Sequence, residues 1–317
     1  MITKKSAATY NSGNKTMTTS DVYQMVTDRI VSMLEQGVVP WQRPWTQSSD
    51  NVAVNYVTRK PYSLLNQILL WEGGEYLTFN QCKAFGGSIK KGAKSRFVVF
   101  YTTSSTSKKK VKDEQTGEET EVTVTKHYDM PVLKWYRVFH LSDCEGIESK
   151  LTDADRGETY ETSPIDNAEE VINGYLGREQ GLIFKNDEAS NRAYYSREYD
   201  EVRVPMITQF KEVEEYYSTA FHELTHSTGI EKRCNRVSEV KGASFFGNAN
   251  YCREELVAEI GAAMLCSLSG ISSEKAFTNS VAYIDGWISH LRNNKTEFVW
   301  AARRAEVAVN YITNNNE

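Results

Sequence analysis

The chain has 317 residues, of which 40% are hydrophobic and 25% are charged, a globular composition with room for two domains. No stretch is apolar enough for a membrane span, and residues 1–20 lack the apolar segment of a secretion signal. We therefore expect a cytoplasmic protein with no membrane partner. Five scattered cysteines without a CxxC pair predict free thiols, which agrees with that location.

The net charge of −5 conceals a difference between the two halves of the chain. Residues 17–145 contain 16 basic and 14 acidic residues, whereas residues 146–317 contain 18 basic and 28 acidic residues. A mildly basic half followed by a strongly acidic half indicates two domains with different partners. We expect a disordered tail at residues 1–16 and a linker at residues 146–165, which contain few large apolar side chains.

The first half is expected to mix helices and strands. A helix is predicted from a cap at Ser20 to about Gln36, before Gly37. The next predicted elements are short helices at 64–71 and 79–84, the latter capped by Thr78, and strands at 96–102, 120–126 and 132–141. The charged residues 103–119 should form an exposed hairpin extension between strands.

The second half is expected to be mainly helical with a few short strands. Its predicted elements are a helix at about 166–178, strands at about 181–186, 192–196 and 201–205, and helices at about 211–228, 250–269, 274–291 and 297–313. Together the two halves predict an α+β protein.

The predicted helix 211–228 carries the sequence His222-Glu223-Leu224-Thr225-His226. Residues four apart share one helix face, so both imidazoles can reach one metal ion. Glu223 lies beside them, where it can act as a catalytic base toward water. A helix with two surface histidines is the alternative, but the apolar stripe of this helix predicts burial, and buried polarity favours a metal site.

The next predicted helix offers the third ligand. We assign Glu255 to the metal and Glu259 to a hydrogen bond with a ligand histidine; Glu254 remains the alternative ligand. Without the upstream histidines, these glutamates would be interpreted as a solvated helix face. Two histidines and one carboxylate favour one zinc ion per chain, although manganese or another divalent ion fits the same ligands.

The segment from Lys83 to Lys112 contains nine basic residues and no acidic residue, with aromatic residues interleaved. Basic side chains along a phosphate backbone and aromatic faces for unpaired bases are what single-stranded DNA requires. A solvated surface and core aromatics are the alternative. The candidate DNA-binding residues are Lys90, Lys91, Lys94, Arg96, Trp41, Trp45 and Tyr62.

Nearly the whole chain, about residues 17–313, resembles the ArdC-like antirestriction family. The first half matches at Pro40-Trp41, Pro44-Trp45, Asn55, Tyr62, Asn66, Leu69-Leu70, Thr78-Phe79-Asn80-Gln81, Gly86, Lys91-Gly92, Val98–Tyr101 and Tyr136-Arg137-Val138-Phe139. The second half matches at Asp200, Pro205, Phe210, His222–His226, Thr228-Gly229 and Glu254–Glu259. A departure is Ser227, where relatives often carry Trp; this change should alter packing and not metal binding.

The resemblance implies an amino-terminal α+β domain that binds single-stranded DNA (17–145), with an antiparallel sheet. It also implies a mainly helical zincin-like metallopeptidase domain with a small sheet (166–317). Such proteins travel on plasmids, conjugative elements and phages and are thought to shield incoming DNA from restriction. We therefore expect an antirestriction-type protein with single-stranded DNA and a protein or peptide substrate as partners. The alternatives are a DNA-binding protection protein whose metal is structural, and a peptidase whose basic half binds a protein.

Overall fold

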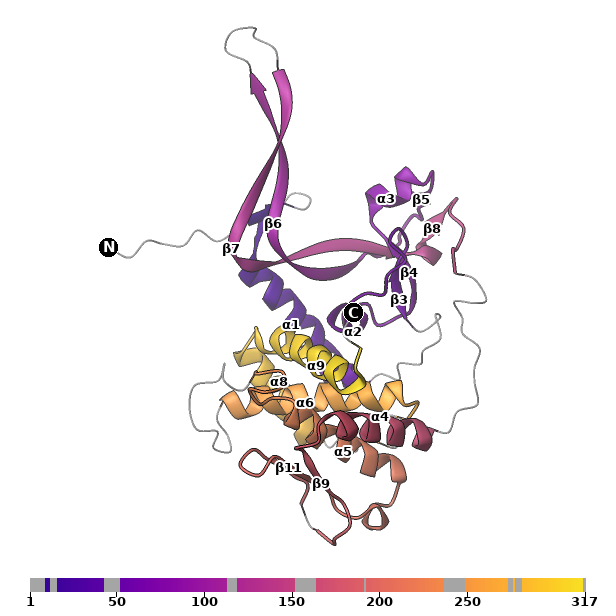
Figure 1. Cartoon of the computed structure of the whole chain (residues 1–317). Helices are drawn as coiled ribbons and strands as arrows, with labels where there is room; N and C mark the ends of the chain where they lie inside the picture. The colour runs from indigo at the N-terminus through magenta and orange to yellow at the C-terminus, as the bar shows by residue number, and fades with distance from the viewer. Residues whose placement is uncertain are drawn as a thin grey trace, which may run out of the picture.

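The structure is a computed structural model that describes residues 9–11, 16–42, 52–112, 119–151, 164–190, 192–236, 249–272, 276 and 281–315. Figure 1 shows the sheets of the first half above a layer of helices, with a long hairpin extending away from the body. The predicted α+β organisation is confirmed. Each half has its own sheet, and the helices of the second half form the larger layer.

The first half is built on a four-stranded sheet of order β3-β4-β7-β6. Its elements are β1 (Thr9–Asn11), β2 (Thr16–Thr18), α1 (Thr19–Glu35), η1 (Pro40–Gln42), β3 (Ala53–Asn55), α2 (Leu64–Leu70), β4 (Gly74–Leu77), α3 (Phe79–Ala84), β5 (Ser88–Ile89), β6 (Arg96–Lys112), β7 (Glu119–His140), η2 (Leu141–Asp143) and β8 (Cys144–Glu145).

Caps at helix starts explain two of these boundaries. Thr78 caps α3 as predicted, and Gln81 completes the capping box. The predicted cap of α1 was Ser20, which is wrong, because Thr18 accepts the backbone N–H of Asp21 and the Asp21 carboxylate accepts the backbone N–H of Thr18. This reciprocal pair starts α1 two residues earlier than a hydroxyl at Ser20 would.

Strands β6 and β7 form one antiparallel ribbon from Arg96↔Val138 to Lys112↔Glu119. The sequence predicts the hairpin extension but divides β7 into two strands, at 120–126 and 132–141. The ladder changes register between Thr102 and Ser104, which pair with Val132 and His127. Pro131 falls in the segment left unpaired by this change, where a missing N–H removes no ladder hydrogen bond.

The second half packs helices against a three-stranded sheet of order β10-β11-β9, in which β10 is an edge strand. Its elements are α4 (Pro164–Arg178), β9 (Ile183–Lys185), β10 (Tyr194–Ser196), β11 (Glu201–Arg203), η3 (Ile207–Gln209), α5 (Val213–Ser227), α6 (Ala249–Leu268), α8 (Val281–Asn293) and α9 (Glu297–Thr313). Among the described helices, none could cross a membrane. All five cysteines are free thiols.

The main hydrophobic core crosses the boundary between the halves. Val26 and Ile30 of α1 belong to the same buried cluster as Ile260 of α6 and Phe298 of α9. Figure 1 shows α1 running along α9 beneath the first sheet. The two halves are therefore coupled through a common core. An isolated segment 17–145 would expose the buried face of α1 to water.

Polar contacts also cross this boundary. The hydroxyl of Thr27 donates to the backbone oxygen of Lys295 at 2.8 Å, and the backbone N–H of Leu64 donates to Glu306 at 3.0 Å. The second contact satisfies an N–H at the start of α2 that the helix itself cannot pair. The orientation of α2 is thus fixed by a side chain of the other half.

Trp41 belongs to this shared core. Its side chain is 1% exposed and packs edge-on against Trp287 and tilted against Phe298, with ring centroids 6.0 Å and 5.8 Å away. The prediction that Trp41 stacks on a DNA base is wrong, because no base can reach a ring enclosed by other side chains. Trp45, the other predicted tryptophan, lies outside the described residues.

We expect Trp41→Ala to lower the free energy of unfolding by about 3–5 kcal/mol, since it empties a large volume in a core that both halves share. Chemical denaturation of the full chain measures this change. Tyr199→Ala is the control, because its side chain is 65% exposed, and it should shift the value by less than about 0.5 kcal/mol. Equal effects of the two substitutions would contradict a shared core at Trp41.

Candidate metal centre

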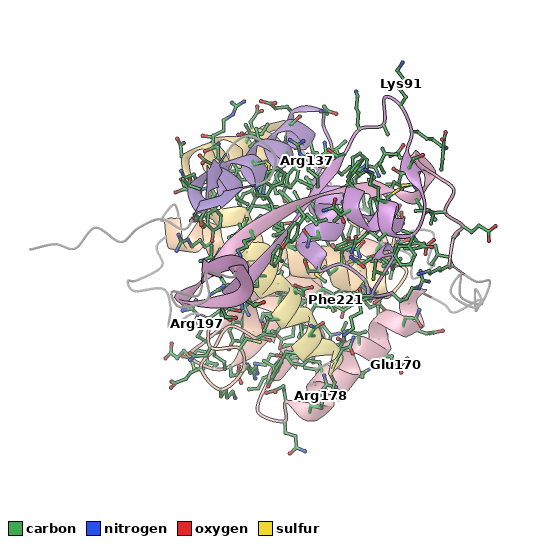
Figure 2. All side chains as sticks on the ribbon, turned by 90° about the horizontal axis from the view of Figure 1, so that it is seen from above. Lys91, Arg137, Glu170, Arg178, Arg197 and Phe221 are labelled. Atoms are coloured by element: carbon green, nitrogen blue, oxygen red, sulfur yellow. The ribbon has the colours of Figure 1, made fainter. Side chains whose placement is uncertain are left out.

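Helix α5 presents His222 and His226 on one face while it buries another. Tyr217, Phe221 and Leu224 are each no more than 1% exposed, so the opposite face packs into the second core. Phe221 lies in the interior of the side-chain view in Figure 2. Four-residue spacing then brings the two imidazoles together edge-to-face, with ring centroids 4.7 Å apart and an interplanar angle of 79°.

Helix α6 approaches α5 closely because of Gly261. A Cβ at that position would lie 2.6 Å from the Cγ2 atom of Thr225 on α5, a distance that atoms do not tolerate. Gly261 therefore permits the contact that sets the height of α6 beside α5. Glu254 and Glu255, in the preceding turns of α6, therefore lie next to the two histidines.

The side chains of His222, His226 and Glu255 converge. The two Nε2 atoms are 3.1 Å apart, and each lies 3.5 Å from a carboxylate oxygen of Glu255. Ligand atoms of all three residues fit within 4.8 Å of one another. Of the residues proposed from the sequence, these are the ones brought together as a ligand set.

The spacing of these atoms fits a tetrahedral metal ion. Ligand atoms about 2.1 Å from such an ion lie about 3.4 Å from each other, close to the separations observed here. Burial alone would lower the pKa of His222, yet its hydrogen bond with Glu255 and two further carboxylates raise it to about 9. The carboxylates thus favour positive charge at this point, and a divalent ion supplies it.

Glu254, the alternative ligand, is held on the far side of His226. It accepts a hydrogen bond from His226 Nδ1 at 3.3 Å and pairs with Arg236, whose Nη2 atom is 2.6 Å from its Oε1 atom. Burial alone would raise the pKa of Glu254, yet the charge of Arg236 lowers it to about 2. A carboxylate on Nδ1 orients the ring, so that Nε2 faces His222 and Glu255, the other two members of the ligand set.

Glu259 lies one turn further along α6 and was expected to accept a hydrogen bond from a ligand histidine. In the described residues that contact belongs to Glu254. Burial raises the pKa of Glu259, against the opposing effects of His222 and of a hydrogen bond with Tyr283. Glu259 therefore acts on the site through its charge and proximity to His222.

Glu223 is the buried carboxylate beside the ligand set, with 8% of its surface exposed. Burial raises its pKa, although the two histidines oppose this effect. The backbone of Tyr195, on the edge strand β10, also opposes the rise of this pKa. A carboxylate with a raised pKa next to a metal has the properties of a general base.

A buried ion pair holds the sheet against α5. Arg233 donates to both carboxylate oxygens of Asp200 at 2.8 Å and to the backbone oxygen of Ser227 at 2.9 Å. The hydroxyl of Tyr195 donates to the same Asp200 at 2.7 Å. Tyr195 is thereby fixed relative to the end of α5.

Sequence analysis did not find Arg236 or Tyr195. Arg236 follows α5 in a loop without periodicity, so no spacing connects it with Glu254. Tyr195 contributes through its backbone, which leaves no trace in residue type. Only the fold could select them.

The predicted DNA-binding residues occupy different surfaces. Lys91 and Lys94 are exposed in the loop between β5 and β6, and Figure 2 shows Lys91 pointing away from the body. Lys90 is exposed and donates to the backbone oxygen of Ser142 at 2.7 Å. Arg96 pairs with Glu72 and donates to the hydroxyl of Tyr76 at 2.6 Å. Tyr62, by contrast, lines a cavity beside α2.

Two family models match the chain, one in each half. Residues 20–139 match the N-terminal domain of anti-restriction factor ArdC, and residues 178–304 match a zincin-like metallopeptidase. Helices α5 and α6, with the convergent histidines and Glu255, lie inside the second match. The chain thus combines an ArdC amino-terminal domain with a zincin-like domain, a class that implies a divalent metal.

Solved structures show the same arrangement over the whole chain. The metal-free crystal structure of the antirestriction ArdC protein from the R388 plasmid is 30% identical, with a TM-score of 0.62, over 93% of this chain and 97% of that one. Its Mn(II)-bound structure is 28% identical, with a TM-score of 0.65, over 93% and 98%. The chain belongs to the ArdC antirestriction family.

Curated relatives occur in two lengths. A DNA primase TraC of Escherichia coli is 29% identical over 302 residues, which are 92% of this chain but 27% of the primase. The uncharacterized protein y4eC of Sinorhizobium fredii is 26% identical over 305 residues, 93% of this chain and 92% of that protein. The chain spans about a quarter of the primase and nearly all of y4eC.

We expect the purified protein to hold about one divalent metal ion per chain, because three ligands converge on one point. His222→Ala and Glu255→Ala should remove the ion, whereas Glu223→Gln should retain it. Elemental analysis by mass spectrometry measures the metal content. Retention of the ion in Glu255→Ala together with its loss in Glu254→Ala would reverse the assignment of the third ligand.

Proposed function

We propose that this protein is an antirestriction-type protein of a mobile element that binds single-stranded DNA and carries a zinc-dependent peptidase site. The family membership and the two domain matches support this function. The single observation that carries the peptidase part is the placement of buried Glu223 beside three convergent metal ligands. We place its action in the cytoplasm, where DNA that enters a cell meets restriction enzymes.

The roles follow from the contacts at the site. His222, His226 and Glu255 hold the metal, and Glu254 orients His226. A bound divalent ion lowers the pKa of water and polarises a peptide carbonyl. Glu223 accepts the proton of the attacking water and then passes it to the leaving nitrogen. The edge strand β10, which contains Tyr195, offers backbone groups to an extended peptide.

Zinc is the metal proposed for this chain, since two imidazoles and one carboxylate with an open position form the common catalytic zinc set. Manganese is the alternative, because the solved ArdC relative exists in a Mn(II)-bound form. Both ions fit the ligand spacing of the site.

Single-stranded DNA is the proposed partner of the first half. The ArdC amino-terminal match supports a DNA interaction, and the exposed lysines of the β5–β6 loop supply positive charge. Phe100 and Tyr136 form a parallel stack, with ring centroids 4.8 Å apart, on one face of the β6–β7 ribbon. The exposed ring of Tyr136 offers a flat face that favours unpaired bases.

The second candidate function is a DNA-binding protection protein whose metal is structural. A structural metal would leave Glu223 without a function. Burying a carboxylate that is not a metal ligand costs free energy, so its presence needs a reason. The burial and raised pKa of Glu223 therefore favour the peptidase.

We expect Glu223→Gln to reduce hydrolysis of an unstructured protein by at least about 100-fold, because it removes the general base. Metal content and affinity for single-stranded DNA should stay at parental values. Release of fluorescent peptides from labelled casein by the zinc-loaded protein measures hydrolysis. Equal rates in the parent and in Glu223→Gln would support the structural-metal alternative.

Neutralising Lys90, Lys91 and Lys94 together to Gln should weaken binding of single-stranded DNA. Each lost phosphate contact should reduce the slope of log affinity against log salt by about 0.7. Fluorescence anisotropy of a labelled oligonucleotide at several salt concentrations measures both quantities. Base stacking also predicts weaker binding to a duplex of the same length.

The control carries the same charge change on the second half, as Lys185, Lys211 and Lys232 all changed to Gln. It should leave the affinity and the salt slope unchanged, apart from a small long-range effect. Equal weakening by the two triple variants would show that only net charge matters and would contradict a binding surface on the β5–β6 loop.

A further inference from the structure

A cavity of about 470 Å³ lies where the two halves meet, between α2, β6 and α9. Its walls include Tyr62, Asn66 and Phe100 from the first half and Val299, Arg303 and Glu306 from the second. Cavities of this size hold small ligands or single building blocks of polymers. The shared core and the contact from Glu306 to α2 fix both walls in place.

Aromatic residues contribute to the lining of this cavity. Tyr62, Phe100 and Tyr101 line it; Phe100 and Tyr101 are consecutive on β6, so their rings lie on opposite faces of the ribbon. The ring of Phe100 stacks on Tyr136 at an interplanar angle of 3°. Tyr136 is 39% exposed, so the stack reaches from the cavity to the surface. The rings of Tyr62 and Phe100 offer flat faces to a flat, unpaired base.

Positive charge lies at the rim of the same cavity. Lys60 and Arg303 are both exposed lining residues, and the guanidinium of Arg303 sits over the ring of Tyr101, 5.0 Å from its centroid. The one acidic lining residue, Glu306, accepts the Leu64 N–H at the start of α2, where the helix dipole offsets its charge. The rim therefore attracts an anion.

We propose that this cavity takes one unpaired nucleotide of single-stranded DNA, with its base against Tyr62 and Phe100 and its phosphate at Arg303. Aromatic walls beside two rim cations match the two parts of a nucleotide, its base and its phosphate. This inference rests on the proposed DNA-binding function. It gives the second half a direct part in DNA binding, although that half is acidic overall.

The test measures affinity of the full chain for a labelled oligo(dT) of about 16 nucleotides, near the upper limit of a single-domain site. Arg303→Ala should weaken binding about tenfold and lower the salt slope by about 0.7. Tyr62→Ala should weaken binding by at least about fivefold, whereas Tyr62→Phe, which keeps the ring, should bind like the parent. A 2-aminopurine placed along the oligonucleotide should lose fluorescence on binding the parent and less on binding Tyr62→Ala.

The matched control is Arg197→Ala, which removes the same charge from an exposed arginine in the turn after β10. Parental affinity in Arg197→Ala with loss in Arg303→Ala, at equal melting temperatures, supports the cavity as a nucleotide site. Parental affinity in both Arg303→Ala and Tyr62→Ala overturns the inference and leaves DNA binding intact elsewhere. A parent that binds no single-stranded DNA overturns the proposed function itself and the nucleotide site with it.

Discussion

The close contact of α5 with α6 at Gly261 is the constraint on which the candidate site depends. Metal ligands from two helices converge only if the helices pack at a close, fixed distance. A side chain at residue 261 of α6 would clash with Thr225 of α5 and push the two helices apart. The two histidines need no such help, since one helix turn aligns them. The third ligand, its neighbour Glu254 and the position of Arg236 all follow from this packing distance.

Helix α6 also explains why the halves form one body. Leu256 and Ile260 face the core shared with α1, whereas Leu265 and Cys266 face the core behind α5. The helix that supplies Glu255 therefore lies between the two hydrophobic cores, as a partition buried on both sides. A metal site on such a partition is rigid, because any shift of α6 disturbs the packing of two cores.

The sequence predicts those features that depend on residues close together in the chain, such as helix boundaries and the spacing of side chains on one helix face. Four-residue spacing grouped His222 with His226, the spacing of α6 placed Glu255 within reach, and helix 297–313 was predicted at its observed boundaries. Three features depend on contacts between distant residues: the burial of Trp41, the pairing of Arg236 with Glu254, and the core across the linker. Periodicity cannot show which buried face meets which, because many partners have the same apolar character.

The partition formed by α6 has a consequence for how such proteins can change by recombination. A crossover in the linker would exchange one half for that of a relative and leave the faces of α1, α6 and α9 mismatched. Genetic elements that trade segments would therefore keep the two halves as one heritable block, together with the side chains that lie between them. Divergence should then be slowest at the buried faces of α1, α6 and α9.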